Sequence, residues 1–249
     1  MEWIRVNAEN LEKEHICCAI AGKKDCGVLA KKAWLQERFQ EGLVFLKGNV
    51  RGKCFIEYIP AEYAWSPVRA DGYMYINCLW VAGQFKGQGF SSQLLDACIR
   101  DSRSQNKHGL CILSAARKMP FLADPGYLKY KGFCRADAAP PYFELWYLPF
   151  DEEAPVPRFN HQVKETHIGE DGYVVYYTHQ CPFTAKYVPL LEQAAREHQI
   201  PFKSTLVDTL EKAKNAPAAV TNFALFSDGN FVTNEILSVK KFLAMHEKR

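Results

Sequence analysis

Five short segments of the first 150 residues have the apolar, aromatic and β-branched pattern of strands. They are LVFLKGN near 43–49, GKCFIEYIP near 52–60, GYMYINCLWV at 72–81, GLCILSA at 109–115 and YFELWYL at 142–148. Between them, residues 23–42 and FSSQLLDACIRDS (90–102) repeat apolar residues at helical spacing. Interleaved strands and helices predict an α/β or α+β layer with a mixed sheet.

A second, shorter pattern follows the segment PFDEEAPVPRFNHQVKETH, in which prolines and charges interrupt any period. We therefore expect a domain at 1–150, a linker at 151–167 and a smaller domain at 168–249. The smaller domain is predicted to be a βαβ unit followed by a hairpin and a helix. The expected elements are strands at 172–178, 200–208, 222–227 and 231–237, and helices at 183–199, 209–215 and 238–245.

Composition and charge exclude several classes of protein. The chain has 249 residues, of which 48% are hydrophobic and 24% charged, and no apolar run approaches the roughly 18 to 20 residues that span a bilayer. With a charged N-terminal segment, this predicts a cytoplasmic protein without a membrane partner. A net charge of +3 without a basic run does not predict nucleic-acid binding.

The nine cysteines include no CxxC pair and do not form a disulfide or zinc framework. His15, Cys17, Cys18 and Cys26 match no standard spacing of metal ligands, so we expect no metal site there.

Two glycines two residues apart mark the most informative turn of the chain. Gly87 and Gly89 lie between the strand ending near Val81 and the helix starting near Phe90. Glycines allow positive φ and close approach of a ligand, and the helix N-terminus offers unpaired N–H groups. With Lys86, Ser91 and Ser92 as further donors, the turn predicts a phosphate site. It matches neither the P-loop nor the dinucleotide fingerprint.

The turn does match QxxGxG, with Gln84, Gly87 and Gly89 between an apolar strand and an amphipathic helix. It thereby resembles the pyrophosphate loop of the GNAT (GCN5-related) N-acetyltransferase superfamily. A downstream GF element at Gly132 and Phe133 agrees with that family's order, and the resemblance covers residues 1–150. It implies an acyl-CoA N-acyltransferase fold, with acetyl-CoA as cosubstrate.

The resemblance also implies how the cosubstrate is held. Main-chain groups of Leu79, Trp80 and Val81 would pair with the pantetheine arm as an added strand does. The pyrophosphate would lie on the loop formed by Gln84, Phe85, Lys86, Gly87, Gln88 and Gly89, with Ser91.

Acetyl transfer by direct attack of an amine needs a base for the amine and often an acid for the leaving thiolate. The family commonly places the acidic tyrosine four residues before the glycine of the GF element, where this chain has Leu128. The flanking Tyr127 and Tyr130 are the candidates, with packing roles as the alternative. Glu57 is the candidate base, because alternation places it on one face with Phe55 and Ile59, where a carboxylate is either functional or paired. Asn77 and Tyr75 would border the same cleft.

The C-terminal pattern resembles a thioredoxin or glutaredoxin fold with CPFT in place of CxxC. Cys181 lies at the strand-to-helix turn, where a helix N-terminus favours the thiolate, and is the candidate reactive thiol. The sequence has no resolving cysteine and no proline before the third strand. A GNAT domain followed by such a domain resembles the YoaP-like acetyltransferases over the whole chain, and we expect the accessory domain to orient the acceptor.

The favoured function is acetyl transfer from acetyl-CoA to a primary amine of a small molecule or peptide. Two alternatives stay open: a CoA-binding sensor or scaffold without turnover, and a thiol oxidoreductase using Cys181. The sequence does not name the acceptor, and a homodimer is compatible with it.

Overall fold

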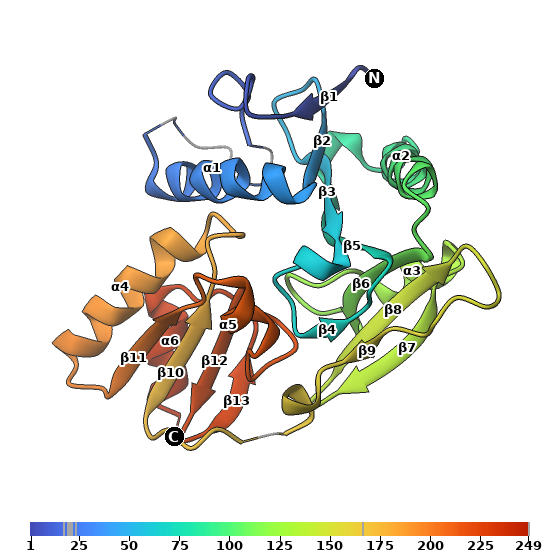
Figure 1. The fold of residues 1–249 in the computed structure, drawn as a ribbon. Coiled ribbons are helices and arrows are strands. Elements are labelled where there is room, and N and C mark those ends of the chain that lie inside the picture. The colour runs from blue at the N-terminus through green and yellow to red at the C-terminus, as the bar shows by residue number, and fades with distance from the viewer. Residues whose placement is uncertain (17, 19–21, 23, 166, 249) are drawn as a thin grey trace.

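A computed structural model describes residues 1–16, 18, 22, 24–165 and 167–248. It contains two main sheets with helices around them (Figure 1). The helices are α1 (Cys26–Arg38), α2 (Phe90–Ser104), α3 (Pro125–Tyr130), α4 (Thr184–Glu197), α5 (Leu210–Lys214) and α6 (Val239–His246). The strands are β1 (Trp3–Val6), β2 (Val44–Gly48), β3 (Cys54–Pro60), β4 (Val68–Arg69), β5 (Tyr73–Val81), β6 (Gly109–Ala115), β7 (Cys134–Ala139), β8 (Phe143–Pro149), β9 (Arg158–Phe159), β10 (Tyr173–Tyr177), β11 (Phe202–Leu206), β12 (Phe223–Ser227) and β13 (Asn230–Thr233).

The first sheet has the strand order β1-β2-β3-β5-β6-β8-β7. Its strands are antiparallel except for β5 and β6, which run parallel. Alternation along the strands explains how both faces are covered. Phe55 belongs to the buried cluster that includes Trp34 of α1, and Ile56 belongs to the cluster that includes Leu94 of α2. The mixed α/β architecture expected from the sequence is confirmed.

The second sheet has the order β11-β10-β12-β13, with β10 and β11 parallel and the other pairs antiparallel. One face packs against α4 and α6, where Val175 meets Leu191 and Phe242 in one buried cluster. The expected order of strands and helices is present, with most boundaries shifted by a residue or two; the last strand, expected at 231–237, is shorter and ends at Thr233. The resemblance to thioredoxin-like folds stays a prediction.

The two sheets share a hydrophobic core. Val174 of β10 and Phe226 of β12 belong to the same cluster of buried apolar residues as Trp65 and Phe45 in the first part of the chain. In Figure 1, α4 lies directly below α1, and the two helices are in contact. The second part of the chain is therefore packed against the first over an apolar surface.

The segment 151–167, expected to be a linker, contributes a short strand. β9 pairs antiparallel with β4, and Val68 lies opposite Phe159, which is fully buried. Part of this segment is thus packed against the first domain.

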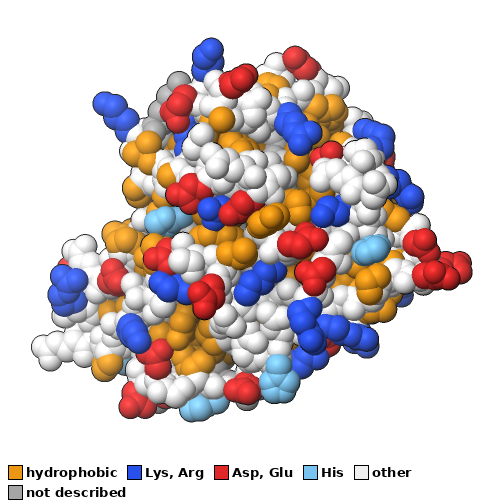
Figure 2. Space-filling model, viewed as in Figure 1, with side chains coloured by type: hydrophobic (Ala, Val, Ile, Leu, Met, Phe, Trp, Pro, Cys, Tyr) orange, Lys and Arg blue, Asp and Glu red, His pale blue; other side chains and the backbone are white. Residues whose placement is uncertain are grey.

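The surface in view in Figure 2 carries Lys and Arg side chains interspersed with Asp and Glu. Among the helices formed by the described residues, none combines the length and apolar character needed to cross a membrane.

Candidate active site

The central feature of the site is a gap between the two parallel strands of the first sheet. β5 pairs with β6 only from Tyr73 to Ile76, opposite Gly109 to Ile112. Beyond that point β5 continues to Val81 paired with β3, while β6 continues to Ala115 paired with β8. Residues 77–81 therefore have no strand partner on the β6 side in the described chain, and their main-chain groups on that side are available to a ligand.

The register of β3 and β5 is interrupted at the same place. Glu57 lies opposite Cys78 and Tyr58 opposite Ile76, so Asn77 is an extra residue on β5. A bulge of this kind re-aims the side chains around it. It brings Asn77 into the wall of a cavity that also contains Glu57.

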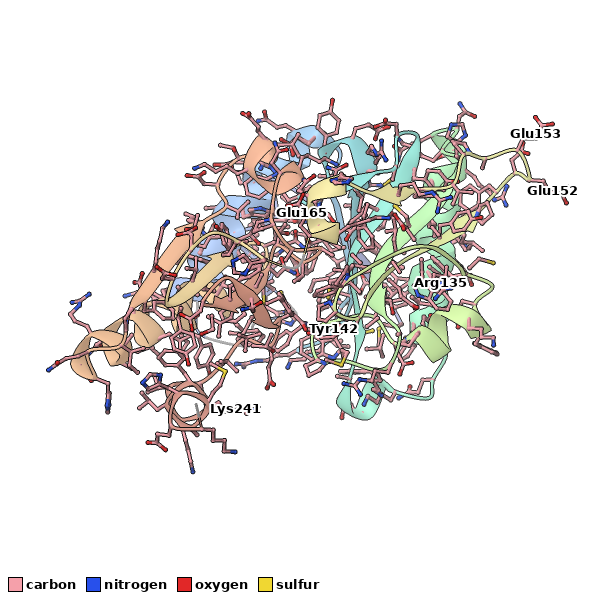
Figure 3. All side chains as sticks on the ribbon, turned by 90° about the horizontal axis from the view of Figure 1, so that it is seen from below. Arg135, Tyr142, Glu152, Glu153, Glu165 and Lys241 are labelled. Atoms are coloured by element: carbon pink, nitrogen blue, oxygen red, sulfur yellow. The ribbon has the colours of Figure 1, made fainter. Side chains whose placement is uncertain are left out.

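This cavity has a volume of about 390 Å³ and lies between the first sheet and the C-terminal part of the chain. The first part supplies residues 75–80 of β5, Phe55 and Glu57 of β3, and Lys31 of α1. The C-terminal part supplies residues 180–183 at the start of α4 and residues 219–223 before β12. Figure 3 shows Tyr142, from the β7–β8 turn, at the junction of the two parts, while Glu152 and Glu153 lie at the end of the first part that is far from the C-terminal part.

Glu57 is held by two partners and is 2% exposed. Lys31 Nζ lies 2.5 Å from Glu57 Oε2, and Asn77 Nδ2 donates to Glu57 Oε1 at 2.9 Å. Lys31 is itself 1% exposed, with its Nζ 4.2 Å from the ring centroid of Trp34. The carboxylate expected to be functional or paired is thus paired, and it also lines the cavity. Its remaining lone pairs are available to a ligand in the cavity.

The glycine loop has the backbone that the sequence predicts. Gly87 and Gly89 have φ of +75° and +76°, and an added Cβ at either position would meet no atom within 4 Å. Gly89 is the N-cap of α2 and, within the described chain, no side chain caps this helix. The first N–H groups of α2 are therefore exposed next to open space, as an anion-binding site requires.

The two candidate acid residues lie apart from Glu57. Tyr130 is 81% exposed. Burial raises the pKa of Tyr127, and the Ser91 hydroxyl acts in the opposite direction, which places Tyr127 beside the start of α2. Both residues are described, and neither belongs to the cavity wall. Leu128, between them, is buried in the core beneath α2.

Cys181 lies in the cavity wall at the start of α4, as expected, but its pKa is shifted upward. Burial raises the pKa of this thiol to about 11, while hydrogen bonds from the backbone of Phe183 and Thr184 lower it by a smaller amount. The effect of the helix N-terminus is present, and desolvation outweighs it. Neutral pH therefore favours the thiol over the thiolate.

Of His15, Cys17, Cys18 and Cys26, where we expect no metal site, Cys17 lies outside the described residues. Within residues 1–16, 18, 22, 24–165 and 167–248, no group of three His, Cys, Asp or Glu side chains could hold a metal ion.

Two parts of the site are absent from the sequence prediction. Lys31 was not singled out, because nothing local in the sequence distinguishes it from Lys32 as the lysine that pairs with Glu57. Sequence periodicity likewise does not predict that residues 180–183 and 219–223 line the cavity, although Cys181 and Pro182 mark a turn that forms part of its wall.

Comparison with known proteins gives matches along the whole chain. The model of the YoaP-like family matches residues 201–243. YoaP of Bacillus subtilis (strain 168), an uncharacterized N-acetyltransferase, is 41% identical over 243 residues, which is 97% of either chain.

Solved structures of GNAT acetyltransferases are more distant. One from Desulfovibrio desulfuricans is 14% identical with a TM-score of 0.42, covering 59% of this chain and 98% of that one. One from Brucella melitensis, in complex with acetyl-CoA, is 16% identical with a TM-score of 0.38, covering 62% of this chain and 90% of that one.

The alignment with the Bacillus subtilis protein covers almost the entire length of both chains. The resemblance to YoaP-like acetyltransferases over the whole chain is thereby confirmed. The chain belongs to the YoaP-like family of GNAT N-acetyltransferases.

Proposed function

We propose that this acetyltransferase transfers the acetyl group of acetyl-CoA to a primary amine that enters the cavity beside Glu57. The observation that carries the proposal is the end of the β5–β6 ladder at Ile76 and Ile112. At this point the unpaired edge of β5, which leads to the glycine loop, meets the cavity that contains Glu57.

In this proposal acetyl-CoA lies along the gap. The main chain of Leu79, Trp80 and Val81 pairs with the amides of the pantetheine arm. The pyrophosphate lies against the N-terminus of α2, where Gln84, Phe85, Lys86, Gly87, Gln88, Gly89 and Ser91 surround it. The uncapped start of α2 and the space around Gly87 and Gly89 support this placement.

Glu57 is the proposed base. The amine lone pair attacks the thioester carbonyl carbon, the C–S bond breaks, and CoA leaves as the thiolate. The amine proton passes to the Glu57 carboxylate directly or through a water molecule. Asn77 Oδ1 is buried with no hydrogen-bond partner among the described residues, so it can accept a second N–H of the amine.

Tyr127 and Tyr130 are not assigned the protonation of the thiolate, because neither lines the cavity. We place Tyr127 instead among the residues that shape the pyrophosphate loop, since it lies beside Ser91.

The test is product formation by the full chain with acetyl-CoA and a panel of primary amines, followed by mass spectrometry. Because the chain carries nine cysteines, released CoA is separated by chromatography and not measured with a thiol reagent. An N-acetylated amine supports the proposal. Binding of acetyl-CoA without any acetylated product would contradict it and favour a CoA-binding sensor.

A further inference from the structure

The C-terminal domain forms part of the cavity wall. Its contribution comes from Gln180–Phe183, from residues 219–223, and from Asn234 and Ile236. These residues are chiefly apolar or carry amide groups. The cavity is therefore a chamber between the first sheet and the C-terminal domain, and the acetyl transfer itself does not explain the role of that domain.

Specific contacts fix this wall in place. Thr221 Oγ1 donates to the carbonyl oxygen of Trp65 at 2.5 Å. Asn234 is 2% exposed and joins two segments of the first domain: its Oδ1 accepts from Tyr142 Oη at 2.7 Å, and its Nδ2 donates to the carbonyl oxygen of Pro120 at 2.8 Å.

A third contact depends on the absence of a side chain. A Cβ added to Gly27 in the first turn of α1 would lie 2.1 Å from the carbonyl oxygen of Pro182. The helix and the turn at Pro182 approach as closely as a glycine allows. Specific contacts between the two parts of the chain therefore fix the shape of the chamber.

The charges of the chamber indicate what it can hold. Its wall contains one cation, Lys31, and one anion, Glu57, among the described residues, and these two are already paired. The rest of the wall includes the aromatic and aliphatic residues Phe55, Trp65, Leu122, Val220, Phe223 and Ile236. A second charged group on the acceptor would be buried without a partner, which is strongly unfavourable.

The size of the chamber points the same way. A volume of about 390 Å³ is at the lower end of the roughly 300 to 1,000 Å³ typical of small-molecule sites. The acetyl end of the cosubstrate must share it. A peptide acceptor would need more room than this volume leaves.

We infer that the acceptor is a small primary amine with an apolar body and no second charged group, and that the C-terminal domain selects for that body. This inference rests on the proposed acetyl transfer. It assigns the accessory domain to substrate selection within the chamber.

The test uses amines that differ in one group. 2-Phenylethylamine is compared with phenylalanine, which adds a carboxylate, and with a phenylalanyl dipeptide, which adds chain length. Butylamine is compared with 1,4-diaminobutane, which adds a second ammonium. We expect kcat/KM to be at least about tenfold higher for the member of each set without the addition, corresponding to about 1.4 kcal/mol.

A preference for the carboxylate, the dipeptide or the diamine would overturn the inference while confirming acetyl transfer to amines. No acetylation of any amine, with acetyl-CoA still bound, would overturn the proposed function together with the inference.

A variant of the C-terminal wall tests the role of that domain. Phe183→Ala enlarges the chamber, and we expect it to shift kcat/KM by about tenfold in favour of 2-phenylethylamine over butylamine, with an unchanged Kd for acetyl-CoA. Leu190→Ala, on the exposed face of α4, which follows Phe183, and outside the chamber, is the control and should change neither quantity. Equal selectivity in Phe183→Ala and the wild type would refute a selective role for the domain.

Discussion

Lys31 Nζ lies 2.5 Å from Glu57 Oε2, and both side chains are almost completely buried. The two residues come from α1 and β3, on one side of the first sheet. A buried ion pair of this kind is costly to break and inexpensive to replace as a whole. Replacing both residues together therefore removes the proposed base without leaving an unpaired buried charge, so the chemical role of Glu57 can be tested apart from its structural role.

The first prediction concerns the stability of this pair. Lys31→Met or Glu57→Gln alone leaves a buried charge without its partner and should lower the free energy of unfolding by about 3 to 5 kcal/mol. The double variant buries no charge and should be more stable than either single variant. Urea denaturation of the three variants measures this, and a double variant that loses the sum of the two single effects would contradict it.

The second prediction concerns the glycine loop. Gly87→Asp introduces a negative charge where the pyrophosphate is proposed to lie, and should weaken acetyl-CoA and CoA binding by at least about tenfold. Gly87→Ala is the matched control, because it places a Cβ on the same positive-φ backbone without a charge. Calorimetric titration of both variants measures the Kd values for acetyl-CoA and CoA. Equal Kd values for the two variants would place the pyrophosphate elsewhere.

The third prediction concerns Cys181. With a pKa of about 11, only about one thiol in ten thousand is ionised at pH 7. The alkylation rate of Cys181 should therefore be low at neutral pH and rise about tenfold per pH unit up to about pH 10. Mass spectrometry of the alkylated peptides resolves it from the exposed Cys134, which serves as the reference for access. A rate that is already at its plateau at pH 7 would revive the thiol oxidoreductase alternative.

The fourth prediction concerns the two tyrosines. Tyr130→Phe should leave kcat and KM unchanged, because the side chain is 81% exposed and outside the chamber. Tyr127 Oη lies beside Ser91 and has no hydrogen-bond partner among the described residues, so it can donate to bound acetyl-CoA. Tyr127→Phe should therefore raise KM for acetyl-CoA by about two- to tenfold, with little change in kcat. A fall in kcat of about a hundredfold in Tyr127→Phe would restore its role as the general acid.

The fifth prediction concerns the close approach of Gly27 in α1 to the turn at Pro182. Gly27→Ala should improve helix propensity yet push the turn at Pro182 away from α1, because the added Cβ would meet the Pro182 carbonyl oxygen. We expect a KM for the amine that is raised by at least about fivefold, with an unchanged Kd for acetyl-CoA. Leu29→Ala, two residues later on the exposed face of α1, is the control. Unchanged amine kinetics in Gly27→Ala would show that this contact does not shape the chamber.

The elements around the proposed cosubstrate site were predictable because their signals are local. β5, the glycine turn and α2 follow one another in sequence, and each has its own pattern of apolar residues or backbone freedom. By contrast, β1 and β7 were missed, since Trp3–Val6 and Cys134–Ala139 are short edge strands of the first sheet with weak alternation.

The chamber was not predictable for a different reason. Its walls meet through contacts between residues far apart in sequence, such as Lys31 with Glu57 and Trp65 with Thr221. The direction of the Cys181 pKa shift was missed for the same reason, because a helix N-terminus is visible in the sequence and the burial that opposes it is not.

The most direct measurement of the central claim is the rate of N-acetyl product formation by the wild type and by the Lys31→Met, Glu57→Gln double variant. We expect acetylated amine from the wild type and a kcat lower by at least about a hundredfold in the double variant, with an unchanged Kd for acetyl-CoA. Equal rates for the two proteins would contradict the assignment of Glu57 as the base.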